Sequence, residues 1–406
     1  MNRIEYPVVT LKEITESIQY GYTTSADFVN KGLYKFLRIT DIQENNVNWD
    51  GVPFAEGLND ENEASKYLLQ EGDVVFARTG ATTGKSYLIS KVPSPTVFAS
   101  YLIRVRPDRS LVTSEYLAYF FQTSMYWRQV EKNKKGAAQA GVNATVLGEL
   151  KIPLLPIEEQ RKITAVLSKV QALIGKRKET IVKLDELIEV VFLDMFGDPV
   201  NNPNKYLKQP VKEICLDILG GGTPSKSKPE YYVGNIPWVT PKDMKKLLIQ
   251  DSIDHINSDA IENSSAKLIP KNSLIMVIRS GILKKKLPLA INQREITINQ
   301  DMKALVLKNE KVKAEYLLFF FNFYQKVLLS KVRSVTADNI EFNQIKELMV
   351  PVPSITEQQK FVDFFNKVSI QQKKEQHNLN QLEIGFQSLL QQAFKGELKI
   401  NIEITA

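Results

Sequence analysis

An internal duplication constrains this chain more than any other feature of its sequence. Residues 149–162 read ELKIPLLPIEEQRK and residues 347–360 read ELMVPVPSITEQQK, so a shift of 198 positions aligns them without a gap. Shorter echoes recur at shifts of 200 or 201: Glu115-Tyr116-Leu117 returns as Glu315-Tyr316-Leu317, and Arg78-Thr79-Gly80 returns as Arg279-Ser280-Gly281. A period near 200 residues is too long for a solenoid repeat, so it indicates two homologous domains.

A long helical pattern follows the proline-rich end of each copy. In the first copy apolar residues recur at steps of three and four up to Met195, and Gly197-Asp198-Pro199 stops the pattern. The second pattern stops at Gly396. A helix of about 40 residues spans about 60 Å, and an apolar stripe of that length needs a partner in water. The nearest partner is the other copy, and the pattern alone permits a parallel or an antiparallel pair.

Polar interruptions of the two stripes favour the antiparallel pair. Arg177 and Glu375 lie 198 positions apart, each near the middle of its helix. Midpoints face each other in an antiparallel pair, so we expect Arg177 to meet Glu375, because a buried charge needs a counter-charge. The alternative is that both side chains reach solvent at the edge of the seam. The residues expected to pair the helices are Leu167, Ile174, Arg177, Ile181, Ile188, Phe365, Glu375, Leu379 and Phe386.

Each copy ahead of its helix mixes strand and helix patterns. Segments 72–77 and 273–278 predict buried strands, 101–106 predicts a strand with one wet face, and 114–130 and 314–331 predict helices. The predicted fold class is α+β, with curved β-sheets in two homologous domains and two long helices forming an antiparallel coiled coil. The predicted divisions are 1–152, 153–198, 199–350 and 351–400.

Charge and cysteine content set broad limits on the class of protein. The net charge of +7 suits a polyanionic partner, although ordinary solubility explains it equally well. A single cysteine, Cys215, excludes an internal disulfide. We find no run of 18 apolar residues and no secretory signal pattern. Together these features predict a cytoplasmic protein that does not enter a membrane.

The segment Gly80-Ala-Thr-Thr-Gly84-Lys85-Ser86 looks like a phosphate-binding loop, but a Walker motif has four residues between its glycines and this segment has three. The equivalent of this segment in the second copy has also lost the second glycine and the serine. A nucleotide-binding enzyme therefore stays the weaker alternative. A tight basic turn suited to phosphates and base edges is favoured, and its candidate DNA contacts are Arg78, Thr79, Thr82, Thr83 and Lys85.

Other basic or polar segments are candidate DNA contacts; basic clusters and polar stretches recur in both copies, and a glycine-rich segment opens the second copy. Gln and Asn side chains can bond adenine bidentately, and a glycine-rich basic segment at 220–228 allows close approach to a phosphate backbone. Ordinary connecting loops remain the alternative for each segment. These candidates are Lys134, Lys135, Gln139, Asn143, Ser225, Lys226, Lys228, Arg279, Ser280, Lys284, Arg333, Thr336 and Asn339.

Residues suited to catalysis are sparse. The two histidines, His255 and His377, lie far apart, and one cysteine with two histidines does not make a zinc site without carboxylates. The sequence has no Gly-x-Ser-x-Gly elbow and no Gly-x-Gly-x-x-Gly motif. We therefore expect no catalytic residue, metal site or cofactor in this chain. An interaction scaffold that does not bind DNA is a further alternative.

The chain resembles the specificity subunits of type I restriction–modification systems over essentially its whole length. The resemblance rests on the two Pro-x-x-x-x-x-Glu-Gln segments that end in Glu159-Gln160 and Glu357-Gln358, each of which opens a long helix. The Gly72-Asp73 and Arg78-Thr79-Gly80 segments, the aromatic helices and the half-chain duplication are also typical of that family.

The resemblance implies a non-catalytic subunit that reads double-stranded DNA. Each recognition domain would read one half of an asymmetric bipartite site, and the helices would set the gap and dock two modification subunits. Those partners would methylate adenine with S-adenosylmethionine. Restriction subunits, bound through the modification subunits, would use ATP and Mg²⁺. The sequence does not reveal the target, the spacer length, which side chains contact bases rather than phosphates, or whether a restriction subunit is present.

Overall fold

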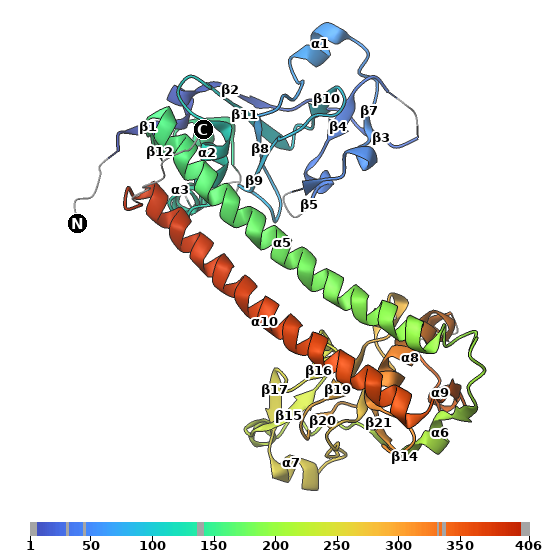
Figure 1. Cartoon of the computed structure of the whole chain (residues 1–406). Coiled ribbons are helices and arrows are strands. Elements are labelled where there is room, and N and C mark those ends of the chain that lie inside the picture. Colours follow the sequence, from blue (N-terminus) through green and yellow to red (C-terminus); the bar gives the residue numbers. More distant parts are fainter. Residues whose placement is uncertain are drawn as a thin grey trace. The chain divides into compact units, whose positions relative to one another are not determined.

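The computed structural model shows two compact units (Figure 1). The first contains residues 1–177 and 378–406, and the second contains residues 178–377. Each unit therefore combines one copy of the repeat with half of each long helix. The residues that the structure describes are 6–29, 32–43, 46–135, 142–330, 333–334 and 338–398, with backbone only at 133–135, 333, 334 and 338.

The first unit contains two four-stranded sheets. The main sheet is antiparallel and has the order β2-β11-β8-β9, while the smaller sheet has the order β10-β4-β7-β3 with β10 and β4 parallel. Buried apolar side chains of both sheets, such as Val75 and Phe98, pack together. The strands are β2 (Thr15–Tyr20), β3 (Ala26–Asp27), β4 (Lys35–Leu37), β7 (Phe54–Ala55), β8 (Val74–Ala77), β9 (Ser86–Leu88), β10 (Thr96–Phe98) and β11 (Leu102–Pro107).

The second unit repeats the order of the four main-sheet strands and adds β16 at the edge, while its smaller sheet has three strands. Its main sheet has the order β14-β21-β18-β19-β16, and its smaller sheet has the order β17-β15-β20 with β15 and β20 parallel. The register repeats as well, because Val105 faces Val74 and Leu305 faces Leu274. The strands are β14 (Cys215–Gly220), β15 (Ile236–Val239), β16 (Leu248–Ile249), β17 (Asp254–Ile256), β18 (Leu274–Val277), β19 (Leu289–Asn292), β20 (Thr297–Ile298) and β21 (Met302–Leu307).

Short elements join the sheets to the long helices in both units. The pairs β1 with β12 and β13 with β24 are antiparallel and occupy equivalent places. Elements without a repeat partner include the hairpin β5 with β6. The bounds are β1 (Val8–Thr10), β5 (Ile42–Gln43), β6 (Asn46–Val47), β12 (Lys151–Pro153), β13 (Lys208–Pro210), β22 (Arg333–Ser334), β23 (Asp338–Asn339), β24 (Met349–Pro351), α1 (Glu61–Ser65), α4 (Ala144–Gly148), α6 (Val211–Ile214), α7 (Ser258–Glu262) and α9 (Phe342–Lys346).

The aromatic helices differ between the copies. The second copy has one helix, α8 (Ala314–Leu329), as predicted. The prediction of one helix over 114–130 was wrong, because the first copy has α2 (Ser114–Phe120) followed by α3 (Ser124–Lys135). The Thr123 hydroxyl causes the break: it donates to the Phe120 carbonyl at 2.7 Å and accepts from the Tyr126 N–H at 3.2 Å. One threonine thus ends α2 and caps α3.

The wet face predicted for strand 101–106 was also wrong. Arg104 on β11 is only 3% exposed, and a loop covers the face on which Arg104 and Arg106 lie. The alternation of polar and apolar residues predicted the strand correctly. It did not reveal that the polar face is buried against carbonyl groups and a carboxylate.

The two long helices have the predicted length and ends. Both α5 (Ile157–Phe196) and α10 (Ile355–Phe394) have 40 residues. Each is followed by a glycine in the left-handed region, since φ is +72° at Gly197 and at Gly396. Glycine adopts this conformation without a side-chain clash, which explains why both helices end there. No helix in the described ranges has both the length and the apolar character that a bilayer crossing requires.

Contacts within each unit confirm an antiparallel pair. In the second unit Phe192, near the end of α5, lies 5.3 Å between ring centroids from Phe361, near the start of α10. In the first unit Tyr119 contacts both helices: its hydroxyl bonds Ser168 of α5 at 2.9 Å, and its ring lies 6.2 Å from Phe386 of α10. Opposite ends of the helices therefore meet in each unit.

Most residues predicted for the helix seam are buried. Arg177 and Ile181 are half-buried, and Glu375 is only 6% exposed and accepts a hydrogen bond from Gln371 at 2.6 Å. The predicted contact between Arg177 and Glu375 joins residues of different units and stays a prediction. The buried seam residues are Leu167, Ile174, Ile188, Phe365, Glu375, Leu379 and Phe386.

Candidate nucleic-acid interface

The turn between β8 and β9 is the centre of the candidate interface in the first unit. Gly80 and Gly84 have φ of +82° and +87°, a conformation that favours glycine. The turn bonds to itself: the Thr83 N–H donates to the Gly80 carbonyl at 3.1 Å, and the Gly84 N–H donates to the Ala77 carbonyl at 2.8 Å. The Lys85 N–H donates to a carbonyl of the same turn. The glycines therefore shape a compact hairpin turn.

This geometry weighs against a nucleotide-binding loop. A phosphate-binding loop directs several consecutive N–H groups toward the phosphate. Here the N–H groups of Thr83, Gly84 and Lys85 all donate to carbonyls within the turn. The turn presents side chains, and Thr79 and Lys85 are exposed while Thr82 is half-buried.

Thr83 has a different place from the one predicted. Its side chain is buried, and its hydroxyl donates to the Gly80 carbonyl at 2.6 Å. A buried hydroxyl that closes the turn is not available to a base or a phosphate. We therefore assign Thr83 to the shape of the turn.

Arg78, at the first position of this turn, contacts the ring of one tyrosine and the backbone of another. The Arg78 guanidinium lies 4.9 Å from the centre of the Tyr20 ring, at the end of β2. The Arg78 N–H donates to the carbonyl of Tyr101, whose side chain is 64% exposed. A guanidinium that stacks on an aromatic ring keeps its donors in one plane for a carboxylate, phosphate or guanine. The sequence prediction included Arg78 and missed both tyrosines, although both lie at ends of predicted or neighbouring strands.

The remaining candidates of the first copy have mixed outcomes. Asn143 caps α4, and its side-chain oxygen accepts from the Val146 N–H at 2.8 Å. A bidentate contact with adenine would therefore compete with the cap. Lys134 and Lys135 lie at the end of α3, but their side chains lie outside the described part of the chain, as does Gln139 altogether.

Hydrogen bonding shows that Arg279 is not the strict equivalent of Arg78. The Arg78 N–H donates to the Tyr101 carbonyl at 3.0 Å, and the N–H groups of Ile278 and Arg279 both donate to the Asp301 carbonyl, at 2.9 and 3.2 Å. The strand register makes Ile278 the counterpart of Arg78. The strands align at a shift of 200, whereas the sequence echo lies at 201. Arg279 therefore comes one residue later in its turn than Arg78 does.

The Arg279 side chain also has a different partner. Its Nε lies 2.6 Å and its Nη2 2.5 Å from one oxygen of the Asp301 carboxylate. Arg279 forms a β-bridge with Asn339, and both residues are exposed. An ion pair neutralises part of the charge that Arg279 would offer to DNA, and Arg78 has no such pair in the described part of the chain.

The other candidates of the second copy fall into two groups. Ser280 caps the turn 281–284 by accepting from the Ile282 N–H at 3.4 Å, and Lys284 at the end of that turn is exposed. Exposed Ser225, Lys226 and Lys228 follow β14 instead, and the Lys228 ammonium bonds the Tyr231 hydroxyl at 2.9 Å. Arg333 is described only by its backbone in β22, and Thr336 lies outside the described residues.

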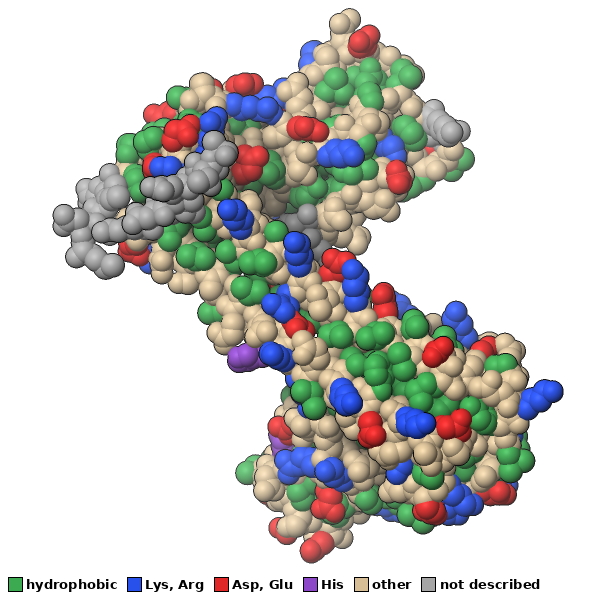
Figure 2. Space-filling view, in the orientation of Figure 1, with side chains coloured by type: hydrophobic (Ala, Val, Ile, Leu, Met, Phe, Trp, Pro, Cys, Tyr) green, Lys and Arg blue, Asp and Glu red, His purple; other side chains and the backbone are tan. Residues whose placement is uncertain are grey.

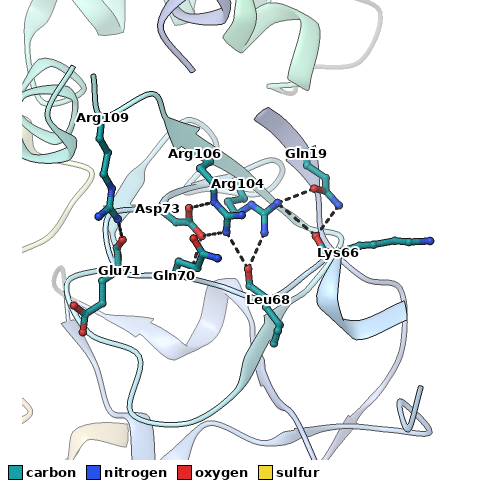
Figure 3. Close-up of polar contacts among 9 residues, drawn as sticks. All are labelled: Gln19, Lys66, Leu68, Gln70, Glu71, Asp73, Arg104, Arg106 and Arg109. Carbon is teal, nitrogen blue, oxygen red and sulfur yellow. Dashed lines mark hydrogen bonds and ion pairs between the residues drawn. The ribbon is translucent and has the colours of Figure 1, made fainter. Parts of the chain in front are cut away.

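A largely buried charged network lies on the main sheet of the first unit, at residues 66–73, 104 and 106 (Figure 3). Asp73, only 2% exposed, bonds Arg106 at 2.8 Å through each of its oxygens and accepts from the Gln70 N–H at 2.9 Å. Arg104 donates to the Leu68 carbonyl at 2.8 Å, and burial lowers the pKa of its guanidinium. The network fastens loop 66–70 to the main sheet. Sequence analysis missed it because Asp73 and Arg106 are 33 positions apart.

The distribution of charge does not locate the interface by itself. On the face drawn in Figure 2, the described Lys and Arg side chains are interspersed with Asp and Glu. No group of His, Cys, Asp and Glu suited to a metal ion occurs among the residues that the structure describes. The turns at 78–85 and 278–288, rather than a patch of one sign, are thus the best-defined candidates.

Comparisons with known proteins agree with the duplication. A family model described as type I restriction modification DNA specificity domain matches residues 4–184 and again 204–384. The chain is 40% identical over 151 residues to the type I restriction enzyme EcoR124I/EcoR124II specificity subunit of Escherichia coli, a match that covers 36% of this chain and only 37% of that protein. It is 21% identical over 423 residues to the EcoKI specificity subunit of Escherichia coli K12, covering 97% of this chain and 88% of that protein.

Two solved structures share the fold. A chain from work on complex assembly and conformational transition of the type I R-M system superimposes with a TM-score of 0.60 at 17% identity, covering 98% of this chain and all of that chain. The type I restriction–modification system S subunit from M. genitalium superimposes with a TM-score of 0.57 at 13% identity, covering 97% of each chain. At these identities the likeness concerns the fold alone.

Proposed function

The chain belongs to the type I restriction–modification DNA specificity family, and on this premise we propose that it is the DNA-reading subunit of a type I complex. The observation that best supports the proposal is the repeated recognition unit. In each copy a turn at the end of the main sheet presents an exposed arginine, Arg78 or Arg279. Arginine is the side chain that most often reads guanine in the major groove, and it also binds phosphates.

The two units are proposed to read different half-sites. Arg78 stacks on Tyr20, whereas Arg279 is paired with Asp301 and displaced by one residue along its turn. The turn of the second copy is also longer, because β18 ends at Val277 and β19 begins at Leu289, compared with Ala77 and Ser86. Two readers of different shape and charge favour an asymmetric bipartite site.

The long helices are proposed to set the gap between the half-sites and to dock two modification subunits. Each helix has 40 residues, or about 60 Å at 1.5 Å per residue. Exposed apolar side chains on a soluble helix often mark a protein contact. Such side chains on α5 and α10 are Leu173, Val182, Leu187, Val190, Leu193, Ile370 and Ile384. The bound partners would supply S-adenosylmethionine chemistry, and restriction subunits would supply ATP and Mg²⁺ chemistry.

Methylome sequencing of the host strain with and without this gene tests the proposal. We expect one bipartite adenine-methylation motif to disappear with the gene and to return on complementation. A methylome that does not change would contradict a role in methylation. Hydrolysis of a nucleotide by the purified chain would instead support the enzyme alternative, and partner binding without DNA preference would support the scaffold.

Replacement of one recognition domain separates the two readers. Exchange of residues 205–345 for another recognition domain of the family should change one half-site and leave the other half-site and the spacer unchanged. Deletion of one heptad from both helices at equivalent positions should change the spacer length alone. Sequencing of the methylated motif reports all three quantities.

A further inference from the structure

Each long helix begins with a buried glutamine that bonds to the recognition unit. Gln160 and Gln358 are both 0% exposed, and each is the fourth residue of its helix. Gln160 accepts from the Thr113 N–H at 2.8 Å and donates to the Leu111 carbonyl at 3.0 Å and the Leu155 carbonyl at 2.7 Å. One side chain thus joins three segments: the turn before α2, the proline-rich hinge and the helix.

The second copy repeats these bonds. Gln358 accepts from the Lys313 N–H at 2.8 Å and donates to the carbonyls of Lys311 at 3.1 Å and Pro353 at 2.9 Å. The aromatic helices reinforce the arrangement, because the Tyr116 and Tyr316 hydroxyls donate to the carbonyls of Pro153 and Pro351 at 2.7 and 2.6 Å. We call the buried pair Gln160 and Gln358, with the groups they bond, the glutamine joints.

The chemistry of the joints requires an amide of this length. A neutral carboxamide has an acceptor oxygen and an NH₂ group with two donors, so one glutamine satisfies one N–H and two carbonyls together. Glutamate at neutral pH only accepts, and leucine does neither. The candidate interfaces of the two units differ in detail, yet both units keep the same three bonds at matching distances. Both units therefore share the same attachment of the recognition unit to its long helix.

We propose that Gln160 and Gln358 are positioning residues that fix the orientation of each recognition unit on its helix. The complex would then distinguish DNA sites whose spacers differ by one base pair. The inference rests on the proposed function. Addition of one base pair moves a half-site by about 3.4 Å and rotates it by about 35°. A hinge made only of backbone dihedrals would absorb such a change, whereas a buried side chain bonded to both parts resists it.

The test compares methylation of duplexes that differ only in spacer length. The full complex with its modification subunits is assayed on the native site and on duplexes whose spacer is one base pair longer or shorter. We expect the wild-type complex to prefer the native spacer by about 100-fold, similar to the effect of a mismatched base pair. In Gln160→Leu and Gln358→Leu this preference should fall to about tenfold or less, and the double variant should fall furthest.

Two controls separate positioning from folding. Gln359→Leu changes an exposed neighbour by the same substitution and should keep the wild-type preference. Discrimination against a base change within a half-site should survive in the joint variants, whereas a reader that is merely destabilised would lose both kinds of discrimination. Gln160→Glu keeps the acceptor for the Thr113 N–H and loses both donated bonds, so it provides the test if the leucine variants do not accumulate.

Each outcome decides between the hypotheses. Folded joint variants that keep the wild-type spacer preference would overturn the inference. Failure of every joint variant to assemble would assign the glutamines to folding and would also overturn it. A wild-type complex that is indifferent to spacer length would refute bipartite reading itself, which is the proposed function and not the joint.

Discussion

The two recognition units fasten the same loop to the same sheet with different chemistry. In the first unit the charged groups of buried Arg104 and Asp73 and of half-buried Arg106 hold loop 66–70. The strand register places Ala304 and Val306 where the first unit has the two arginines. Neutral groups hold the loop in the second unit instead: Asn292 donates to the carbonyls of Ile269 and Pro270, and the Ser273 hydroxyl also donates to the Pro270 carbonyl.

This comparison shows which features the two copies of the fold have in common. Strand order and register match between the units, and the glutamine joints match bond for bond. The bonded loop carbonyls and their donors do not match: the first unit bonds Lys66 and Leu68, and the second bonds Ile269 and Pro270. Any buried donor of suitable reach avoids the free-energy cost of an unpaired carbonyl. The longest run of matching sequence therefore lies where the units attach to the helices, and only short echoes remain elsewhere in the units.

Removal of the charged anchor should have the largest effect on stability. Asp73→Ala leaves the half-buried Arg106 guanidinium without its carboxylate and the Gln70 N–H without its acceptor. We expect a loss of about 3–5 kcal/mol in the free energy of unfolding of the first unit. Hydrogen exchange of peptides that cover loop 66–70 measures the loss. Equal exchange in wild type and variant would show that the network does not hold the loop.

The amide anchor of the second unit should be less costly to remove. Asn292→Ile introduces the residue type found at Ile89, the equivalent position of the first unit. It leaves the Ser273 N–H without its acceptor and removes one donor from the Pro270 carbonyl, which keeps its bond from the Ser273 hydroxyl. We expect a loss of about 2–3 kcal/mol, because the groups left unpaired are uncharged. The same exchange measurement on peptides around 269–270 checks it. A loss of stability greater than that of Asp73→Ala would show that the neutral anchor contributes more than the charged one.

These anchors also mark the limit of prediction from sequence. Periodicity and glycine signals are local, and they predicted both 40-residue helices and their ends at Gly197 and Gly396. The partners of Arg104 are loop carbonyls about 36 positions away, and no local pattern identifies them. The turn at Gly80 was predicted, whereas the ring beneath Arg78 comes from Tyr20, a residue brought there by strand pairing.

The two interface arginines should differ in their contribution to DNA binding. Arg78→Ala should weaken binding of the complex to its site by about 5–150-fold, the range of a lost specific contact. Arg279→Ala should weaken it by only about threefold, because Asp301 already neutralises part of that charge. Fluorescence anisotropy on one duplex at fixed salt measures both. If Asp301→Asn strengthens binding and Arg279→Ala then costs as much as Arg78→Ala, the ion pair accounts for the difference.

The smallest predicted effect concerns two equivalent glutamates in the first turns of α2 and α8. Glu115 is exposed, whereas Glu315 is partly buried, and desolvation raises the pKa of the Glu315 carboxyl above its usual value of 4.5. The folded state then binds the proton more tightly than the unfolded state, so Glu315 reduces stability as pH rises above 4.5. Glu315→Gln should stabilise the protein by about 0.5–1 kcal/mol at pH 7, and the gain should vanish at pH values below 4.5.

Glu115→Gln is the matched control, because it removes the same charge from the same helix position. Because Glu115 is exposed, Glu115→Gln should remove only the favourable interaction of the carboxylate with the helix N-terminus, which costs about 0.3 kcal/mol of stability at pH 7. Urea unfolding of both variants between pH 4 and pH 7 gives the comparison. Equal changes in the two variants would show that burial of Glu315 has no consequence for its ionisation. Changes of opposite sign in the free energy of unfolding at pH 7 would show that the two equivalent glutamates have different electrostatic environments.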